Sequence, residues 1–263
     1  MYEALDLHYE QRGEPRGSAF PVLILHGLFG SLANWRSLAR RLASRRRVYS
    51  VDLRNHGRSP HARPHDCRAM AHDCAHFIRV HAGGRVALIG HSMGGRVAMY
   101  LALRHAELVE RLVVIDASPK SGAAAEPRRV LDALLALQPE RFEDREAVDT
   151  VLAATVADAG VRASLLMNLE RRPDGGVRWR IGLEEIAESF DRLGAALPDG
   201  RYDGPGLFVR GGRSDYLPAS DEPLVKAAFP AADVVTIADA GHLPHVDTPE
   251  RLASVIDAFL ERG

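Results

Sequence analysis

Cysteine is scarce in this sequence. Of 263 residues only Cys67 and Cys74 carry thiols, and they lie seven residues apart in a segment whose pattern predicts a helix. Seven residues rise ~10 Å along a helix, whereas a disulfide needs Cα atoms within about 7 Å of each other. We therefore expect two reduced thiols and, as the matching location, the cytoplasm.

Long hydrophobic runs are also missing. The longest uncharged run, residues 18–35, is interrupted by proline and glycine, so it does not form a membrane-spanning helix. Residues 1–11 alternate apolar and acidic side chains and lack the apolar stretch of a signal peptide. We therefore expect neither segment to insert into a membrane.

The sequence has almost no net charge. Its 34 Lys and Arg residues are matched by 35 Asp and Glu residues, which gives a formal charge of −1. This balance excludes the strongly basic surface of a general nucleic-acid binder and any marked attraction to an anionic membrane. With 46% hydrophobic and 26% charged residues, the composition is that of a soluble globular protein. The length is about 1.75 times the ~150-residue yardstick, which fits one large domain or one domain with an insertion.

Short apolar runs alternate with longer segments of helical periodicity. Strands are predicted at residues 5–10, 21–25, 47–53, 86–90, 112–115, 206–210 and 234–238, with helices at 31–42, 67–81, 93–105, 223–229 and 249–261. This alternation predicts the α/β class, with a mostly parallel sheet covered by helices on both faces.

The alternation stops between residues 119 and 197. Helical patterns occur at 130–137, 147–157 and 183–193, and a glycine-rich turn with a possible small ribbon lies at 174–181. We interpret residues 119–198 as a helical cap insertion. The sheet domain then consists of residues 1–118 and 199–263.

The segment 90–95, Gly-His-Ser-Met-Gly-Gly, lies between a predicted strand and a predicted helix. A G-x-S-x-G pattern in that context is typical of a nucleophile elbow, a sharp turn that exposes its serine at the edge of the sheet. The alternative is a structural glycine-rich turn. We favour Ser92 as a nucleophile, with the start of the following helix favouring negative charge beside it.

Such a serine needs a base and an acid that orients the base. Among twelve histidines, His242 is the best candidate, because it comes late in the chain directly after the last predicted strand. We expect His245 to be a packing residue. Two aspartates are candidates for the acid: Asp116 follows the predicted strand 112–115, and Asp215 follows the strand 206–210. Both lie between Ser92 and His242 in chain order, so order leaves both open.

An acyl-transfer site also needs donors for an oxyanion, and backbone amides are the usual ones. One candidate is the N–H of Met93, the residue after the serine. The other is the N–H of Leu28, in the loop 26–30 that follows the strand 21–25. An ordinary glycine turn is the alternative interpretation of this loop.

Five segments together carry a family resemblance: 26–31 (His-Gly-Leu-Phe-Gly-Ser), 52–59 (Asp-Leu-Arg-Asn-His-Gly-Arg-Ser), 90–95, 114–119 (Val-Ile-Asp-Ala-Ser-Pro) and 241–242 (Gly-His). In this order they resemble the α/β-hydrolase superfamily, and more narrowly its small intracellular esterase and thioesterase branch of bacteria and mitochondria. The resemblance spans almost the whole chain. It implies an eight-stranded, mostly parallel sheet with a helical cap after the sixth strand.

The resemblance also bears on the acid. In the narrower branch the acid follows the sixth strand, which matches Asp116, whereas in most of the superfamily it follows the seventh, which matches Asp215. We favour Asp116, because its Asp-Ala-Ser-Pro context fits the narrower branch, and keep Asp215 as the alternative. Leu243 stands where this branch usually has a tryptophan, a difference that would alter the shape of the acyl pocket.

These residues predict a cofactor-free serine hydrolase that cleaves a small-molecule carboxylic ester or thioester through an acyl-enzyme. We expect Phe29, Leu217 and Leu243 to line its substrate pocket. A C–C bond hydrolase or perhydrolase with the same triad is the alternative among enzymes. A non-catalytic ligand-binding protein is the alternative outside them, which the apparent triad disfavours.

No metal site is predicted. His72 and His76 lie four residues apart on a predicted helix, but the sequence has no H-E-x-x-H motif, and we interpret both as surface residues.

Overall fold

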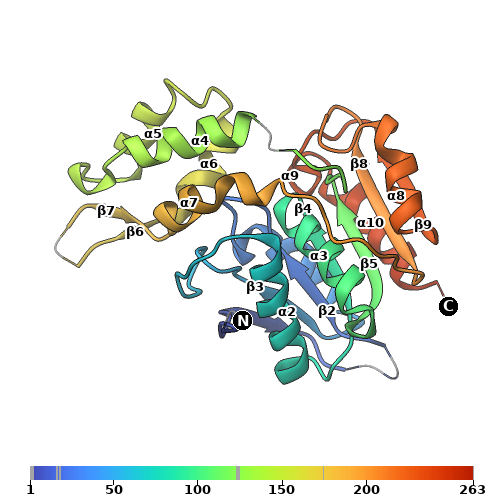
Figure 1. The fold of residues 1–263 in the computed structure, drawn as a ribbon. Coiled ribbons are helices and arrows are strands. Elements are labelled where there is room, and N and C mark those ends of the chain that lie inside the picture. The colour runs from blue at the N-terminus through green and yellow to red at the C-terminus, as the bar shows by residue number, and fades with distance from the viewer. Residues whose placement is uncertain (1–2, 16, 18, 123–124, 174, 263) are drawn as a thin grey trace.

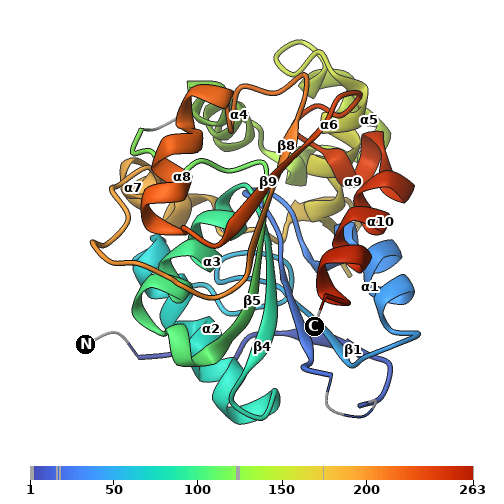
Figure 2. The ribbon, with the colours of Figure 1, turned by 90° about the vertical axis from the view of Figure 1, so that its right-hand side faces the viewer.

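The computed structural model describes residues 3–15, 17, 19–122, 125–173 and 175–262. Within them the main sheet has seven strands in the order β1-β3-β2-β4-β5-β8-β9 (Figures 1 and 2). The strands are β1 (Tyr9–Arg12), β2 (Val22–Leu25), β3 (Val48–Val51), β4 (Val86–His91), β5 (Val109–Ile115), β8 (Gly206–Gly211) and β9 (Ala232–Ile237). Only the β1–β3 pair is antiparallel. The mostly parallel sheet predicted from the sequence is confirmed.

The sheet lies between two layers of helices because its central strands are apolar on both faces. Along β2, Leu23 and Leu25 pack into one hydrophobic core, while Val22 and Ile24 pack into the other. The first core is covered by α2 (Cys67–His81), α3 (Met93–Arg104) and α8 (Glu222–Ala228), and the second by α1 (Arg36–Leu42) and α10 (Pro249–Leu260), as Figure 2 shows. Cys67 and Cys74 lie on the buried face of α2 and form no disulfide.

Most of the chain between β5 and β8 forms a separate group of elements. This group lies above the end of the sheet at which β4 and β5 end (Figure 1). It contains α4 (Ala125–Ala136), α5 (Arg145–Leu152), α6 (Ala159–Leu165), α7 (Leu183–Leu193), the short helix η4 (Leu166–Asn168) and a two-stranded antiparallel sheet of β6 (Leu169–Arg171) and β7 (Val177–Trp179). Leu131, Leu165 and Ile186 from this segment join the larger hydrophobic core. This chain between β5 and β8, called the inserted segment below, therefore packs directly on the main sheet and its helices.

The first strand begins later than predicted. The sequence pattern indicates a strand at 5–10, but Leu5 N–H donates to Asp73 Oδ1 (3.0 Å) and His8 N–H donates to Ser59 Oγ (2.8 Å). These side chains replace a partner strand, so regular pairing starts at Tyr9. Among the described residues no strand precedes β1, and the main sheet has seven strands, one fewer than the eight that the resemblance implies.

Differences within the inserted segment are also local. The helix α6 has only seven residues and was not predicted, because so short a segment carries little periodicity. The predicted ribbon at 174–181 begins at a residue outside the described ones; β7 lies within the predicted range, whereas its partner β6 precedes that range.

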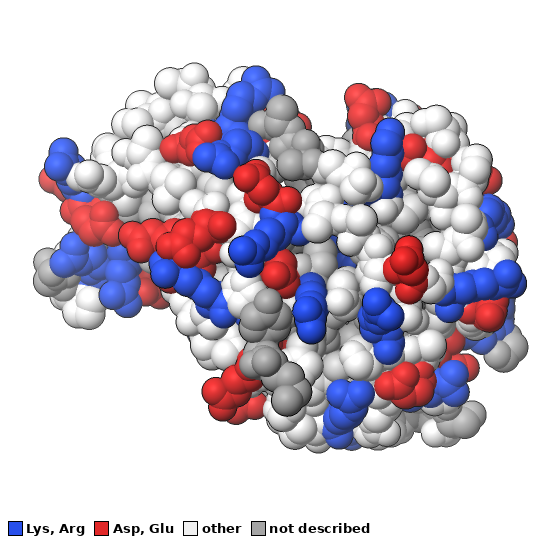
Figure 3. Space-filling view, viewed as in Figure 1, with Lys and Arg blue, Asp and Glu red and all other residues white. Residues whose placement is uncertain are grey.

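Charged side chains of both signs lie on the described surface, in agreement with the nearly equal numbers of basic and acidic residues in the sequence. Figure 3 shows Lys and Arg side chains interspersed with Asp and Glu over the face in view. None of the described helices is long and apolar enough to cross a membrane.

Candidate active site

Ser92 occupies the sharp turn between β4 and α3. Its backbone angles are φ 52° and ψ −118°, a left-handed conformation that costs a side-chain-bearing residue about 1–3 kcal/mol. The turn also depends on glycine, because a Cβ on Gly94 would lie 2.5 Å from the carbonyl oxygen of His26. Ser92 N–H is fixed by donation to Ile115 O on the neighbouring strand (3.0 Å). The sequence-predicted elbow is therefore present as a strained, restrained turn.

Three predicted residues meet in one chain of contacts. Ser92 Oγ lies 3.0 Å from His242 Nε2, and His242 Nδ1 lies 2.8 Å from Asp116 Oδ2. A carboxylate only accepts hydrogen bonds, so the proton of the neutral imidazole sits on Nδ1 and the lone pair of Nε2 faces the serine. In this tautomer His242 can accept the proton of the serine hydroxyl.

Asp116 is completely buried at the end of β5. Besides His242, it accepts the N–H of Gly211 at Oδ1 (3.0 Å) and the hydroxyl of Ser214 at Oδ2. These donors compensate for the lost hydration of a buried carboxylate and fix its orientation. Gly211 is the last residue of β8, and Ser214 lies in the turn that follows this strand.

Asp215 has a different setting. Its side chain is exposed at the rim of a cavity, and among the described residues no hydrogen bond or ion pair joins its carboxylate to His242. The structure thus brings Asp116, and not Asp215, to the histidine.

Two further histidines pack around His242. His91 Nε2–H donates to the carbonyl oxygen of His242 (2.7 Å), and burial holds the pKa of His91 well below its ordinary value, so the ring is neutral. His245 stacks on Trp35 with ring centroids 4.4 Å apart, and burial lowers the pKa of His245 to about 4. The packing role expected for His245 agrees with this position.

The loop after β2 presents the N–H of Leu28. Gly27 O accepts hydrogen bonds from His26 Nδ1 (2.8 Å) and from Gly30 N–H (3.0 Å). Because the peptide between Gly27 and Leu28 is planar and trans, fixing this carbonyl aims the Leu28 N–H in the opposite direction. Met93 is the first residue of α3, so its N–H has no acceptor within the helix. Leu28 and Met93 line the same cavity as Ser92.

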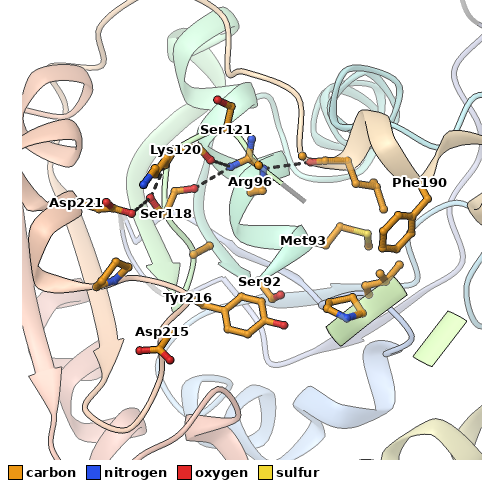
Figure 4. A pocket seen from close by; sticks show the side chains of 17 residues that line it. Ser92, Met93, Arg96, Ser118, Lys120, Ser121, Phe190, Asp215, Tyr216 and Asp221 are labelled. Carbon is orange, nitrogen blue, oxygen red and sulfur yellow. Dashed lines mark hydrogen bonds between the residues drawn. The ribbon is translucent and has the colours of Figure 1, made fainter. Parts of the chain in front are cut away.

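Two cavities meet at Ser92. The larger, of about 410 Å³, is drawn in Figure 4, where Met93 and Phe190 lie on one side of Ser92 and Lys120, Ser118 and Asp221 lie at the far end. The smaller, of about 170 Å³, has a mainly apolar wall of Phe29, Val130, Val161, Leu165 and Leu243. Leu28, Pro127 and Tyr216 border both cavities.

One pocket prediction is wrong. Leu217 lines neither cavity; its side chain is fully buried in the larger hydrophobic core. Its carbonyl is held by Arg210 Nε (2.8 Å), which fixes the turn so that Tyr216, the preceding residue, faces His242 instead.

Three residues at the site carry no recognisable signal in the sequence. Tyr216 stacks on His242, Phe190 of α7 lines the larger cavity, and Asn168 of η4 contacts the Leu28 loop. Tyr216 directly follows Asp215, and the acid is the only group in that turn that a triad motif points to. The other two lie in the inserted segment, which carries no recognisable motif.

Comparisons with known proteins agree with this geometry. A family model described as alpha/beta hydrolase fold matches residues 21–249. The sn-1-specific diacylglycerol lipase ABHD11 of Danio rerio is 39% identical over 254 residues, which cover 94% of this chain and 80% of the lipase. Esterase YbfF of Escherichia coli is 30% identical over 240 residues, covering 91% of this chain and 92% of the esterase.

A solved structure, a marine microorganism esterase, superimposes with a TM-score of 0.92 at 35% identity, covering 97% of this chain and 100% of that one. Fold, elbow and sequence similarity thus agree along nearly the full length of the chain. The protein belongs to the alpha/beta hydrolase fold family, in its esterase and lipase branch.

Proposed function

We propose that this protein is a serine hydrolase that cleaves carboxylic esters, and thioesters by the same route, through an acyl-enzyme on Ser92. The observation that carries the proposal is the continuous line of contacts from Asp116 Oδ2 through both nitrogens of His242 to Ser92 Oγ, at 2.8 and 3.0 Å. Names of similar proteins, which include a lipase and an esterase, support ester substrates.

In the first half of the reaction, Ser92 Oγ attacks the acyl carbon while His242 Nε2 takes the hydroxyl proton. The carbonyl oxygen becomes an oxyanion, stabilised by the N–H groups of Leu28 and Met93. Collapse of this intermediate breaks the bond to the leaving group, which receives the proton from His242. An alcohol or thiol departs and the acyl group stays on Ser92.

In the second half, water attacks the acyl-enzyme. His242 takes a proton from the water, the same two amides stabilise the second oxyanion, and the proton returns to Ser92 Oγ as the carboxylic acid leaves. Asp116 remains a carboxylate throughout. It holds the Nδ1–H tautomer and stabilises the imidazolium that forms at each step.

The two cavities suit the two parts of a substrate. We assign the acyl group to the smaller cavity, since its wall is mainly apolar and its volume of about 170 Å³ is less than half of the 410 Å³ of the larger cavity. The leaving group then enters the larger cavity, which continues toward Lys120 and Ser118. A short acyl chain on a larger alcohol is the substrate shape that this division favours.

The inserted segment contributes walls to both cavities, through Val161 and Leu165 on one side and Phe190 and Leu193 on the other. We therefore propose residues 119–198 as a cap that sets specificity. Residues 1–118 and 199–263 form the catalytic domain.

The test is a graded panel of p-nitrophenyl esters and acyl-coenzyme A thioesters, combined with labelling by a fluorophosphonate that reacts with activated serines. Wild-type protein should hydrolyse the short esters and gain the mass of one phosphonyl group. Ser92→Ala should lose both the hydrolysis and the label, whereas Ser254→Ala, which removes an exposed hydroxyl of α10, should retain both. Full ester hydrolysis by Ser92→Ala would contradict the proposal.

A further inference from the structure

Asn168 reaches from the inserted segment to the loop that presents the Leu28 N–H. It lies in η4, its side chain is 2% exposed, and Nδ2 donates to Phe29 O (2.6 Å) and to Leu165 O (3.1 Å). Both partners are carbonyl oxygens, which only accept hydrogen bonds, so the amide can satisfy them only with its nitrogen turned toward them.

Phe29 needs such support because of its backbone conformation. Its φ is 60°, in the left-handed region that costs a residue other than glycine about 1–3 kcal/mol. Two buried side chains hold it: His56 Nε2 accepts the Phe29 N–H (3.1 Å), and Asn168 Nδ2 donates to the Phe29 carbonyl oxygen. His56 comes from the sheet domain, whereas Asn168 is 139 residues away in the chain and belongs to the inserted segment.

Only the second of these restraints depends on where the inserted segment sits. His56 is fixed within the sheet domain, since its Nδ1–H donates to Arg54 O (3.0 Å) and its ring is completely buried. Asn168 moves with η4, which follows α6 directly. Phe29 O and the Gly30 N–H belong to one planar peptide, and this N–H donates to Gly27 O (3.0 Å), the carbonyl of the peptide that carries the Leu28 N–H. The packing of η4 against Phe29 O therefore bears on the orientation of the Leu28 N–H.

We propose that Asn168 is a positioning residue for the oxyanion loop, so that the Leu28 N–H is aligned for catalysis only while η4 is packed against the loop. The proposal rests on the proposed function, in which this N–H stabilises the oxyanion. It makes the inserted segment part of the catalytic apparatus as well as a wall of the substrate cavities. Asn168 itself does not contact the reacting atoms.

Loss of the Asn168 contact should weaken one oxyanion donor without removing it. Outright loss of a donor lowers kcat about 10²–10³-fold, so a misaligned donor should lower it by about tenfold to 10²-fold. Binding of the uncharged substrate should change little, because the effect arises only when negative charge develops on the carbonyl oxygen. The signature is therefore a fall in kcat at nearly constant KM.

The experiment compares Asn168→Leu, which keeps the number and branching of the side-chain heavy atoms and removes the donor, with His61→Leu as matched control. His61 Nε2–H also donates to a main-chain carbonyl across the same junction, Arg180 O (3.0 Å), but it does not touch the loop. For each variant we would measure kcat and KM, the thermal unfolding midpoint, and inhibition by two ketones of equal chain length. A trifluoromethyl ketone forms an oxyanion on Ser92, whereas the methyl ketone binds as a neutral molecule.

Asn168→Leu should lose about tenfold or more in affinity for the trifluoromethyl ketone and keep its affinity for the methyl ketone, while His61→Leu should keep both. If Asn168→Leu does not fold, Asn168→Ser, which shortens the side chain and leaves the polar group out of reach, is subject to the same expectation. Equal losses for both ketones, or no loss for either in a folded variant, would overturn the proposed role of Asn168. An inactive wild-type protein would instead overturn the proposed function.

Discussion

The ring of Tyr216 lies flat against the imidazole of His242, with centroids 3.6 Å apart and an interplanar angle of 18°. Tyr216 also borders both cavities, so a single aromatic side chain supports the histidine and divides the space in front of Ser92. Burial raises the pKa of Tyr216 to about 12, so the ring carries no charge at neutral pH.

Stacking should hold the imidazole in the plane that its contacts with Ser92 and Asp116 require. Aromatic pairs contribute about 0.5–1.5 kcal/mol beyond burial, so Tyr216→Leu should lower kcat by up to about tenfold. Tyr216→Phe keeps the ring and should stay close to wild type. Steady-state kinetics on one short ester suffices, and equal losses in the two variants would show that the hydroxyl, not the stacked ring, is what matters.

The assignment of the smaller cavity to the acyl group predicts the effect of filling it. Val161 lines this cavity and not the larger one. Val161→Trp should shift the preference among p-nitrophenyl esters toward the shortest acyl chain, and leave the preference for the alcohol unchanged. A shift in alcohol preference instead would reverse the roles assigned to the two cavities.

Arg96 of α3 joins both ends of the inserted segment to the helix that follows Ser92. Its guanidinium donates to Ser118 O (2.9 Å) and Lys120 O (2.8 Å) where the segment begins, and to Leu193 O (3.2 Å) and Ala195 O (2.6 Å) near its end. Dashed lines in Figure 4 mark such bonds.

Arg96→Met keeps the aliphatic stem and removes all four hydrogen bonds, so we expect the free energy of unfolding to fall by about 2–3 kcal/mol. Arg104→Met, which changes an exposed arginine at the end of the same helix, should stay within about 0.5 kcal/mol of wild type. Urea denaturation gives both values. A loss no larger for Arg96 than for Arg104 would mean that these bonds contribute nothing net.

Acid should destabilise the protein through its buried histidines, and His65 is the clearest case. Its side chain is fully buried, Nδ1 accepts from Asn55 Nδ2 (3.1 Å), and within the described chain Nε2 has no hydrogen-bond partner. Burial lowers the pKa of His65 to about 3. In the unfolded chain the pKa returns to about 6.5.

The folded pKa is the lower one, so the unfolded state binds the proton first as the pH falls. The contribution of His65 to stability is complete above pH 6.5 and is lost toward pH 3, with about 2 kcal/mol gone by pH 5. His65→Gln should flatten the decline in unfolding free energy between pH 6.5 and 5. His72→Gln, at an exposed position of α2, should leave that slope unchanged, and identical slopes in the two variants would refute the role of His65.

Much of this structure follows from patterns that are local in the sequence. The predicted helix 67–81 has the observed bounds, because Asp66 caps it by accepting Ala69 N–H (2.8 Å) and its apolar face is continuous. The elbow around Ser92 could also be predicted, since a turn so crowded by neighbouring backbone admits few residues other than glycine at its flanks.

Contacts between distant segments could not be predicted in this way. Chain order does not distinguish Asp116 from Asp215, and only the packing of β8 and the turn after it beside β5 brings Gly211 N–H and the Ser214 hydroxyl to Asp116. The prediction that Leu217 lines the substrate pocket is wrong for the same reason, because the direction of a side chain in a turn depends on the fold around it. The contact between Asn168 and Phe29 joins two segments without a shared motif.

The proposed triad depends on the assignment of Asp116, rather than Asp215, as the acid that orients His242. Asp116→Asn keeps the shape of the side chain but favours the wrong tautomer of His242, with the Nε2 lone pair no longer facing Ser92. Asp215→Asn removes an exposed charge at the cavity rim, without a contact to His242 among the described residues.

The most direct measurement is therefore kcat of these two variants on one short p-nitrophenyl ester, with both shown to be folded by their unfolding midpoints. Asp116→Asn should lose about 10³–10⁴-fold in kcat, and Asp215→Asn should remain close to wild type. The reverse order, or small and similar losses in both, would contradict the triad of Ser92, His242 and Asp116.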